Sequence, residues 1–395
     1  MFTLAATLRA STYYHALALN RLSLLDKYCQ PGIRPFSELP PERQLINRPF
    51  MMAHILTTKT VGRASHYHGE CCRFAMGPLF GRWVRKQAVP GTHFISCHGY
   101  FNDLIEWIQE HGGSYYLDAG SSHPSNFWSL MAEEYARWDC PLPPIWPRHH
   151  LRQQKSAVLA DYVLAPSRFV EDSYAQRGFP KDRIFRLPYP VNRSVFTPRE
   201  QPRPADRPLT LASSGLLSLR KGSGYLFEAF KLIRKEVPDA RLKLIRAMAS
   251  NFEPAFKHRG YDQLPVEWSG KMPHAQLADW LRDSDFFVLP TIEEGMVRSA
   301  AEALCCGIKV ITTPNAGADD HIIEGENGSI VPIRAPQAIA DAVLAWWDRM
   351  QSGDAPNPWE SPQPGDLSLD SFTSKLQSII NLTKPATISR QPTGN

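Results

Sequence analysis

Strand and helix patterns alternate along the second half of the chain and constrain the fold more than any other feature. An apolar run that ends in small residues (209–215) precedes an amphipathic segment (224–237). The same order recurs at FFVLP (286–290) and RSAAEALCCG (298–307). Short apolar runs that alternate with helices are typical of a parallel sheet covered on both faces. This half is therefore predicted to be an open α/β domain.

Proline marks the predicted domain boundaries. The stretch TPREQPRPADRP (197–208) is typical of an exposed, semi-rigid linker, and a second proline-rich stretch lies at 355–364. We predict an N-terminal α/β domain at 1–198, a second at 208–350, and a helix within 365–384 that packs back on the N-terminal domain. Two such domains would face each other across a cleft, where open sheets bind ligands. Residues 30–90 indicate no clear order of elements.

Composition excludes several classes of protein. The chain is 43% hydrophobic and 21% charged, which is typical of a globular protein. Lys and Arg (44) only slightly outnumber Asp and Glu (39), without the dense basic stripe of a nucleic-acid binder. No apolar run approaches the roughly 20 residues of a membrane helix, and the N-terminus lacks the basic start of a signal peptide. The seven cysteines form no CxxC motif, so we expect reduced thiols in a cytoplasmic protein.

The most informative polar residues lie between the strand at 286–290 and the helix that follows it. Glu294 and Gly295 lie where a strand-end loop meets a helix N-terminus, whose amides and dipole suit a phosphate or diphosphate. Gly295 lacks the Cβ that would keep a ligand from the backbone. Glu302, one to two turns into the helix, could accept hydrogen bonds from two ribose hydroxyls. The alternative is a solvated loop acid and an ordinary helix glutamate.

These residues resemble a known family. Glu294 and Glu302 form the E-x7-E pair of retaining glycosyltransferases of the GT-B fold, family 4, and EALCCGIKVITTPNAG and HIIEGENGSIVPI are similar to the segments that follow it. Upstream, 163–198 is similar to the family's domain-crossing segment and 213–245 to its donor-phosphate loop and helix. The resemblance covers about 160–335 and is weak before 95. Four motifs in the family's order are more specific than one glutamate pair.

The resemblance implies two Rossmann-like domains and a retaining transfer of a sugar. The donor would be a nucleotide-diphosphate sugar, and the acceptor a hydroxyl of a glycan or lipid-linked molecule. No cofactor and no essential metal are expected. Cell-envelope or exopolysaccharide biosynthesis would be the setting, in the cytoplasm or peripherally at the inner membrane face. The alternatives are a nucleotide-sugar epimerase on the same fold and a catalytically inactive GT-B scaffold that binds nucleotide or glycan.

The resemblance also implies a role for each matching residue. Glu294 would hydrogen-bond the transferred sugar of the donor, and Glu302 would hydrogen-bond the ribose of the donor. The amides of 295–298 would approach the sugar and the diphosphate. Lys221, with Arg220, would neutralise the charge that develops on the leaving diphosphate; the alternative is a solvated turn. The predicted donor-binding residues are Gly215, Arg220, Lys221, Glu294, Gly295, Met296, Val297 and Glu302. The sequence departs from the family at three places: Leu216 stands where it has arginine, Val297 where it often has glycine, and PYPVN (188–192) where it usually has P-x-G-V-D.

His123 is the predicted catalytic residue of the N-terminal domain. It follows the strand-like GSYYLDAG and precedes a helix opened by Pro124. It resembles the histidine that the family places near the transferred sugar, and it could hydrogen-bond the sugar or steer the acceptor hydroxyl. The alternative is a helix-capping or core histidine. The predicted catalytic residues are thus His123, Lys221 and Glu294.

A His/Cys cluster and a basic run could each bind a ligand, and each also has a simpler interpretation. His66, His68, Cys71 and Cys72 have the spacing of metal ligands, but without a second cluster we expect a polar loop and no metal site. The basic run WPRHHLRQQK (146–155) could contact anionic lipid headgroups or an acidic acceptor. The alternative for this run is a solvated helix face.

Overall fold

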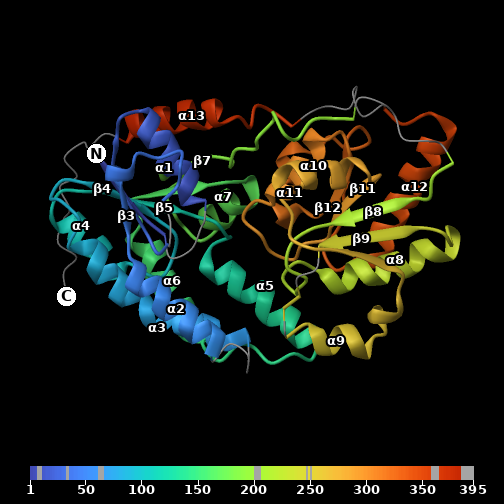
Figure 1. Ribbon diagram of the computed structural model, residues 1–395, viewed down its shortest axis with the longest axis horizontal. Helices are drawn as coiled ribbons and strands as arrows, with labels where there is room; N and C mark the ends of the chain where they lie inside the picture. Colours follow the sequence, from blue (N-terminus) through green and yellow to red (C-terminus); the bar gives the residue numbers. More distant parts are fainter. Residues whose placement is uncertain are drawn as a thin grey trace.

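The computed structural model describes residues 1–6, 11–32, 35–60, 66–199, 206–245, 248–249, 251–356 and 364–383. Two sheets lie side by side, each with helices on its faces (Figure 1). Every strand pair recorded within the two sheets is parallel. The predicted α/β class with parallel sheets is confirmed.

The first sheet has seven strands in the order β3-β2-β1-β4-β5-β6-β7. Its strands are β1 (Phe2–Ala5), β2 (Leu25–Gln30), β3 (Gln44–Ile46), β4 (His93–Ser96), β5 (Tyr115–Asp118), β6 (Tyr162–Ala165) and β7 (Ile184–Arg186). Its helices and short 3-10 turns are α1 (Thr12–Arg21), η1 (Pro41–Arg43), α2 (Arg48–Thr60), α3 (His66–Arg85), α4 (Asn102–Glu110), α5 (Pro124–Arg137), α6 (Trp146–Leu159), α7 (Arg168–Ala175) and η2 (Lys181–Arg183).

The polar loop predicted around His66 is wrong. Helix α3 begins at His66, so the backbone of His66, His68, Cys71 and Cys72 is helical. The side chains of these four residues lie outside the described part of the structure. No group of metal-binding side chains occurs among the residues that are described.

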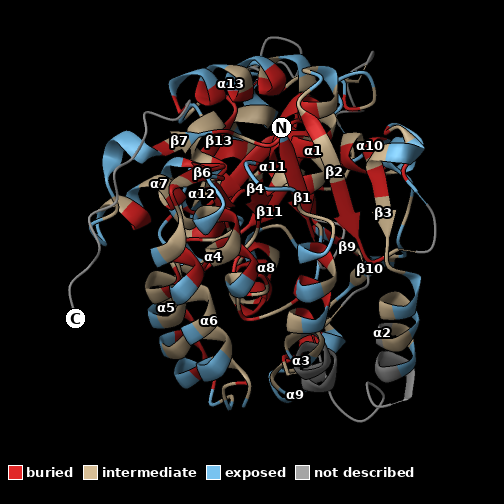
Figure 2. Cartoon of the chain, turned by 90° about the vertical axis from the view of Figure 1, so that its left-hand side faces the viewer, coloured by how far each residue is buried: buried red, intermediate tan, exposed pale blue. Residues whose placement is uncertain are grey.

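The second sheet has six strands in the order β10-β9-β8-β11-β12-β13. Its strands are β8 (Thr210–Ser213), β9 (Arg241–Ile245), β10 (Val266–Ser269), β11 (Phe286–Leu289), β12 (Lys309–Thr312) and β13 (Gly328–Ile330). Its helices and 3-10 turns are α8 (Ser223–Glu236), α9 (Glu253–His258), η3 (Tyr261–Gln263), α10 (His274–Arg282), α11 (Arg298–Cys305), η4 (Pro314–Ala316), η5 (Asp319–His321) and α12 (Pro336–Ser352). Strands β8, β11 and β12 are buried along their whole length, because helices cover both faces of the sheet (Figure 1). Buried residues gather in the middle of the molecule and exposed ones on the outer helices (Figure 2).

The last described helix, α13 (Leu369–Leu382), lies against α1 of the first sheet (Figure 1). The Tyr116 hydroxyl of β5 lies 2.6 Å from Thr383 Oγ1, just beyond α13. Arg21 at the end of α1 pairs with Asp370 at 2.6 Å. The chain therefore returns to its N-terminal part after completing the second sheet. No described helix combines the length and the apolar character that a membrane crossing requires.

Candidate active site

A cavity of about 540 Å³ lies between the two sheets. The N-terminal part contributes Ser11, Tyr14, Gly120 and Tyr189 to its walls, and the C-terminal part contributes residues from the loop after β8 and from α11. Four predicted donor-binding residues line it: Gly215, Lys221, Met296 and Glu302. The predicted cleft between the domains is present at the carboxyl ends of the strands, as expected for open parallel sheets.

Lys221 and Glu294 lie together at the edge of this cavity. The lysine Nζ is 3.3 Å from Glu294 Oε2. Burial raises the pKa of Glu294, but the positive charges of Arg220 and Lys221 outweigh burial and hold the pKa below its ordinary value. Gly215, at φ +105°, makes room for this lysine, since a Cβ there would lie 3.2 Å from Lys221 Cε. The site thus pairs an ionised carboxylate with an ammonium group.

Glu302 is paired with an arginine that sequence reasoning did not single out. Arg298 lies one helical turn before it in α11, and its Nη2 donates to Glu302 Oε1 at 3.2 Å. The same guanidinium donates to the Tyr14 hydroxyl and stacks 5.1 Å from the Tyr14 ring centroid. The i, i+4 spacing of Arg298 and Glu302 was the available signal. No local pattern in the sequence indicated the contact between Arg298 and Tyr14, because these residues are 284 positions apart.

Arg220 contacts Glu293 and does not line the cavity between the sheets. Its Nε lies 2.8 Å and its Nη2 2.7 Å from Glu293 Oε2, and Nη2 also donates to Ser121 Oγ at 3.1 Å. Burial opposes the charge of Arg220, but the carboxylates of Glu293 and Glu294 raise its pKa above the ordinary value. Glu293 Oε1 accepts hydrogen bonds from the Ser122 amide at 2.8 Å and the Ser122 hydroxyl at 2.9 Å. We name these contacts of Glu293, Arg220, Ser121 and Ser122 the Glu293 bridge; it joins the two halves of the chain.

The loop before α11 is used for contact between the two halves. A Cβ at Gly295 would lie 2.4 Å from the Gly120 carbonyl oxygen, so glycine permits two backbones to meet. The Gly295 carbonyl accepts a 2.6 Å hydrogen bond from Ser167 Oγ, and the Met296 sulfur one of 3.2 Å from the Tyr189 amide. The Val297 amide donates to the Ala316 carbonyl at 3.0 Å, and its approach to a diphosphate stays a prediction.

His123 caps the N-terminus of α5, as the capping alternative predicted. Its Nδ1 accepts a hydrogen bond from the Ser125 amide at 3.2 Å, and its own amide donates to Ser173 Oγ at 2.8 Å. Burial, with help from the positive charge of Arg177, lowers the pKa of His123 to about 4. The ring is therefore neutral at pH 7, and because Nδ1 is an acceptor, the proton is on Nε2. His123 is not among the residues that line the cavity between the sheets.

His98 and His123 both contact Tyr174, His98 by a hydrogen bond to its hydroxyl and His123 with ring centroids 5.1 Å apart. These two histidines predict that stability falls in acid. Burial lowers the pKa of His98 to about 3 and that of His123 to about 4, whereas unfolded histidines titrate near about 6.5. Between about pH 6.5 and about pH 4 the unfolded chain binds more protons, so the free energy of unfolding decreases as the pH falls through this window. Urea unfolding at about pH 7.5 and about pH 5 measures the decrease.

Matched variants test whether His123 causes this pH dependence of stability. Asparagine caps helices well, so His123→Asn should keep α5 and reduce the pH dependence. His111→Asn, at an exposed position, should leave the pH dependence unchanged. An equal pH dependence in wild type and His123→Asn would contradict the assignment to His123.

Comparisons with known proteins show similarity to one family over part of the chain. The family model for "Glycosyl transferases group 1" matches residues 208–349. The D-inositol 3-phosphate glycosyltransferase of Xylanimonas cellulosilytica is 28% identical over 252 residues, which cover 53% of this chain and 58% of the relative. The GDP-mannose-dependent alpha-(1-6)-phosphatidylinositol monomannoside mannosyltransferase of Mycolicibacterium smegmatis is 27% identical over 208 residues, 47% of this chain and 52% of the relative. The chain thus spans about half the length of the curated relatives it matches.

The fold is similar to a solved structure over nearly the whole chain. Anabaena Alr3699/HepE, solved in complex with UDP and glucose, superposes with a TM-score of 0.64 at 12% identity. The likeness covers 96% of this chain and 99% of that one. Two parallel sheets that face each other across a cavity are the architecture of the GT-B fold. Residues 208–349 therefore match the model of the glycosyl transferases group 1 family, and the chain has the GT-B fold.

Proposed function

We propose that this chain is a retaining glycosyltransferase that moves a sugar from a nucleotide-diphosphate sugar to a hydroxyl of a glycan or lipid-linked acceptor. The observation that carries the proposal is the cavity between the sheets, which presents Lys221, Arg298 and Glu302 to a ligand. A cation beside the diphosphate and a carboxylate for the ribose are the groups that such a donor requires. The structural relative HepE, which binds UDP and glucose, supports a donor of this class.

Lys221 is the proposed stabiliser of the leaving group. As the bond between the sugar C1 and the phosphate oxygen breaks, negative charge grows on the diphosphate, and a fixed ammonium group lowers the energy of that charge. Its partner Glu294 is proposed to hydrogen-bond the sugar while keeping the lysine in place at 3.3 Å. Arg220 contributes positive charge at longer range, because its guanidinium is held by Glu293.

We favour front-face displacement because neither carboxylate of this site is free to act as a covalent nucleophile. Glu302 is paired with Arg298 and Glu294 with Lys221, and a carboxylate held by a cation is a weakened nucleophile. In the proposed step the acceptor oxygen bonds to C1 on the face that the diphosphate leaves. The acceptor proton passes to the departing phosphate oxygen, so no covalent sugar–enzyme intermediate forms. His123 would present its Nε2–H to a sugar or acceptor hydroxyl.

The setting is proposed from the relatives. The mycobacterial relative is named for a phosphatidylinositol mannoside acceptor, which supports a lipid-linked or glycan acceptor for this chain. We propose a role in cell-envelope or exopolysaccharide biosynthesis, with no cofactor beyond the donor. Peripheral contact with the inner membrane face would bring the enzyme to such acceptors.

Calorimetric titration with UDP and GDP tests the donor site. Glu302→Ala should weaken binding by about tenfold or more, because a hydrogen bond to a charged group contributes about 1.5–3 kcal/mol. Glu267→Ala, an exposed glutamate on β10 of the same sheet, is the matched control and should bind like wild type. Absence of binding of either nucleotide to the folded wild type would overturn the proposed function. Unchanged binding by Glu302→Ala would overturn the role of this residue.

A further inference from the structure

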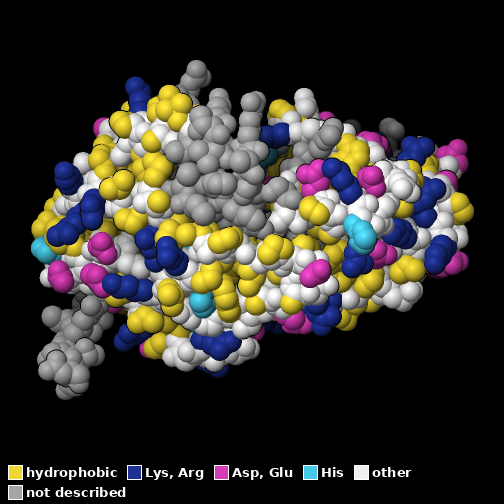
Figure 3. All heavy atoms as spheres, turned by 90° about the horizontal axis from the view of Figure 1, so that it is seen from below, with side chains coloured by type: hydrophobic (Ala, Val, Ile, Leu, Met, Phe, Trp, Pro, Cys, Tyr) yellow, Lys and Arg dark blue, Asp and Glu magenta, His cyan; other side chains and the backbone are white. Residues whose placement is uncertain are grey.

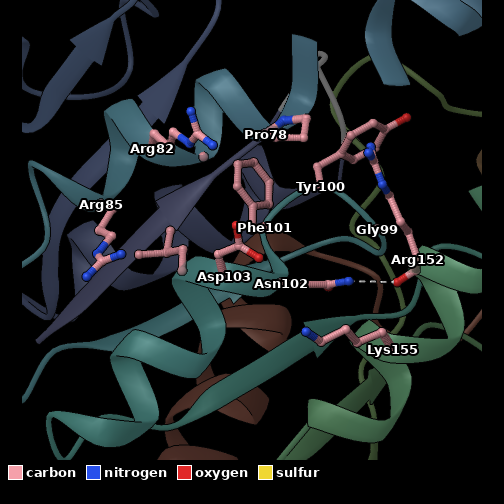
Figure 4. Close-up of a pocket in the computed structure, with 12 residues that line it drawn as sticks. Pro78, Arg82, Arg85, Gly99, Tyr100, Phe101, Asn102, Asp103, Arg152 and Lys155 are labelled. Carbon is pink, nitrogen blue, oxygen red and sulfur yellow. Dashed lines mark hydrogen bonds between the residues drawn. The ribbon is translucent and has the colours of Figure 1, made fainter. Parts of the chain in front are cut away.

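A second cavity, of about 310 Å³, lies within the N-terminal part of the chain. Helix α3 contributes Arg82 and Arg85, and helix α6 contributes Arg152 and Lys155. Figure 4 shows these two pairs on opposite sides, with the loop of Tyr100 and Phe101 and the start of α4 between them. None of its lining residues also lines the cavity between the sheets.

The positive charge of this cavity exceeds its negative charge. Lys155 pairs with Glu106 at 2.7 Å. In the described part of the chain, no carboxylate lies within 4.0 Å of the other three cations of the cavity, Arg82, Arg85 and Arg152. Asp103 is the carboxylate among the lining residues. The cavity is thus matched to a ligand with more than one negative charge.

Arg152 is held in place without a carboxylate. Its Nη1 donates to the Phe74 carbonyl at 2.7 Å, and its guanidinium lies 3.6 Å from the Phe74 ring centroid. Burial lowers the pKa of Arg152, while Asp103 and Tyr100 act in the opposite direction. A guanidinium fixed by an aromatic ring and one carbonyl keeps donors for an anion.

We propose that this cavity binds the phosphate group of a phosphate ester. Arginine forks match the oxygens of phosphate in paired hydrogen bonds, and three arginines at one cavity favour phosphate over a single carboxylate. The volume of about 310 Å³ exceeds a bare phosphate and accommodates the organic part of an ester. The same chemistry is offered by a free phosphate ester and by a phospholipid headgroup.

Exposed apolar side chains lie near the residues that line this cavity, which favours a separate test of a phospholipid headgroup as the phosphate ester. Leu79 on α3 and Leu151 on α6 are 59% and 65% exposed, and Val158 near the end of α6 is 84% exposed. On the face seen from below, hydrophobic side chains are exposed beside Lys and Arg on the side of the seven-stranded sheet (Figure 3).

Two probes distinguish the sources. Glycerol 3-phosphate is titrated into the full chain by calorimetry with UDP in excess, and Lys221→Ala is titrated in parallel to exclude the donor cavity as the source of the signal. Sedimentation with phosphatidylcholine vesicles, with and without phosphatidic acid, tests the headgroup. Saturable binding of glycerol 3-phosphate identifies a free ester as a ligand. Binding only to vesicles that contain phosphatidic acid identifies the headgroup.

Arg82→Gln/Arg85→Gln locates the binding. Both side chains are exposed, so the variant should fold, and it should weaken binding of either probe by about tenfold or more. Lys181→Gln/Arg183→Gln removes the same charge from exposed positions of η2, outside the cavity, and should bind like wild type. Failure of both probes, wild-type binding by the cavity variant, or an equal loss in the control would overturn the proposal. Nucleotide binding is measured in a separate titration. The outcome for the proposed donor site therefore does not change the conclusion about the phosphate-ester cavity.

Discussion

Glu293→Ala is expected to lower the free energy of unfolding by about 1–3 kcal/mol, the cost of leaving buried hydrogen-bonding groups unsatisfied. The Glu293 side chain is 0% exposed and accepts hydrogen bonds from Arg220 and Ser122. Its removal leaves the Ser122 amide without its acceptor and the Arg220 guanidinium, which is 33% exposed and still donates to Ser121, without its carboxylate partner. Urea unfolding followed by circular dichroism measures the loss.

A double variant separates the bridge from simple cavity formation. If the stranded charge causes the loss, Glu293→Ala/Arg220→Ala should lose less stability than the sum of the single variants. Glu267→Ala, on the exposed side of β10, serves as the control for removing a carboxylate. A loss in Glu293→Ala no larger than in this control would show that the bridge does not stabilise the fold.

Lys221→Ala is expected to lower kcat for sugar transfer by about 10²–10³-fold, the usual effect of removing one group that stabilises transition-state charge. The lysine lines the cavity between the sheets, the proposed donor site, and lies beside Glu294. Because the charge on the diphosphate is larger in the transition state than in the bound donor, the loss should appear mainly in kcat. Steady-state kinetics with the donor identified by calorimetry measures kcat and KM separately.

The conservative variant and a surface variant complete this test. Lys221→Arg should recover part of the rate, since it keeps the positive charge. Lys271→Ala, at an exposed position of the same half of the chain, should leave kcat unchanged. A change in KM alone for Lys221→Ala would assign the lysine to donor binding and contradict its role in the transition state.

Local patterns in the sequence were sufficient for the strands of the second sheet. The run Phe286–Leu289 is buried at every position, and a continuous apolar run is the local pattern of a strand covered on both faces. Residues 30–90 lack such a run, and they hold η1, β3, α2 and α3. Strand β3 is three residues long with one buried position, too short to be recognised from its own pattern.

The contacts of the neighbouring acids Glu293 and Glu294 could be predicted only in part from the sequence. Both follow the same strand, and the motif drew attention to Glu294. The fold orients Glu293 toward Ser122, 171 residues away, and Glu294 toward Lys221. Glu293 was missed because its importance comes from burial between the two halves, a property that the local sequence does not carry.

The sequence by itself determined the α/β class, the cleft between two parallel sheets and the lysine and glutamate that line it. These follow from local periodicity and from motifs whose residues lie close together in the chain. Only the tertiary structure decided that Arg220 and Glu293 join the two halves, that Arg298 pairs Glu302 with Tyr14, and that α3 and α6 form a basic cavity. Each of these contacts joins side chains from distant segments, so it exists only once the sheets and helices have packed.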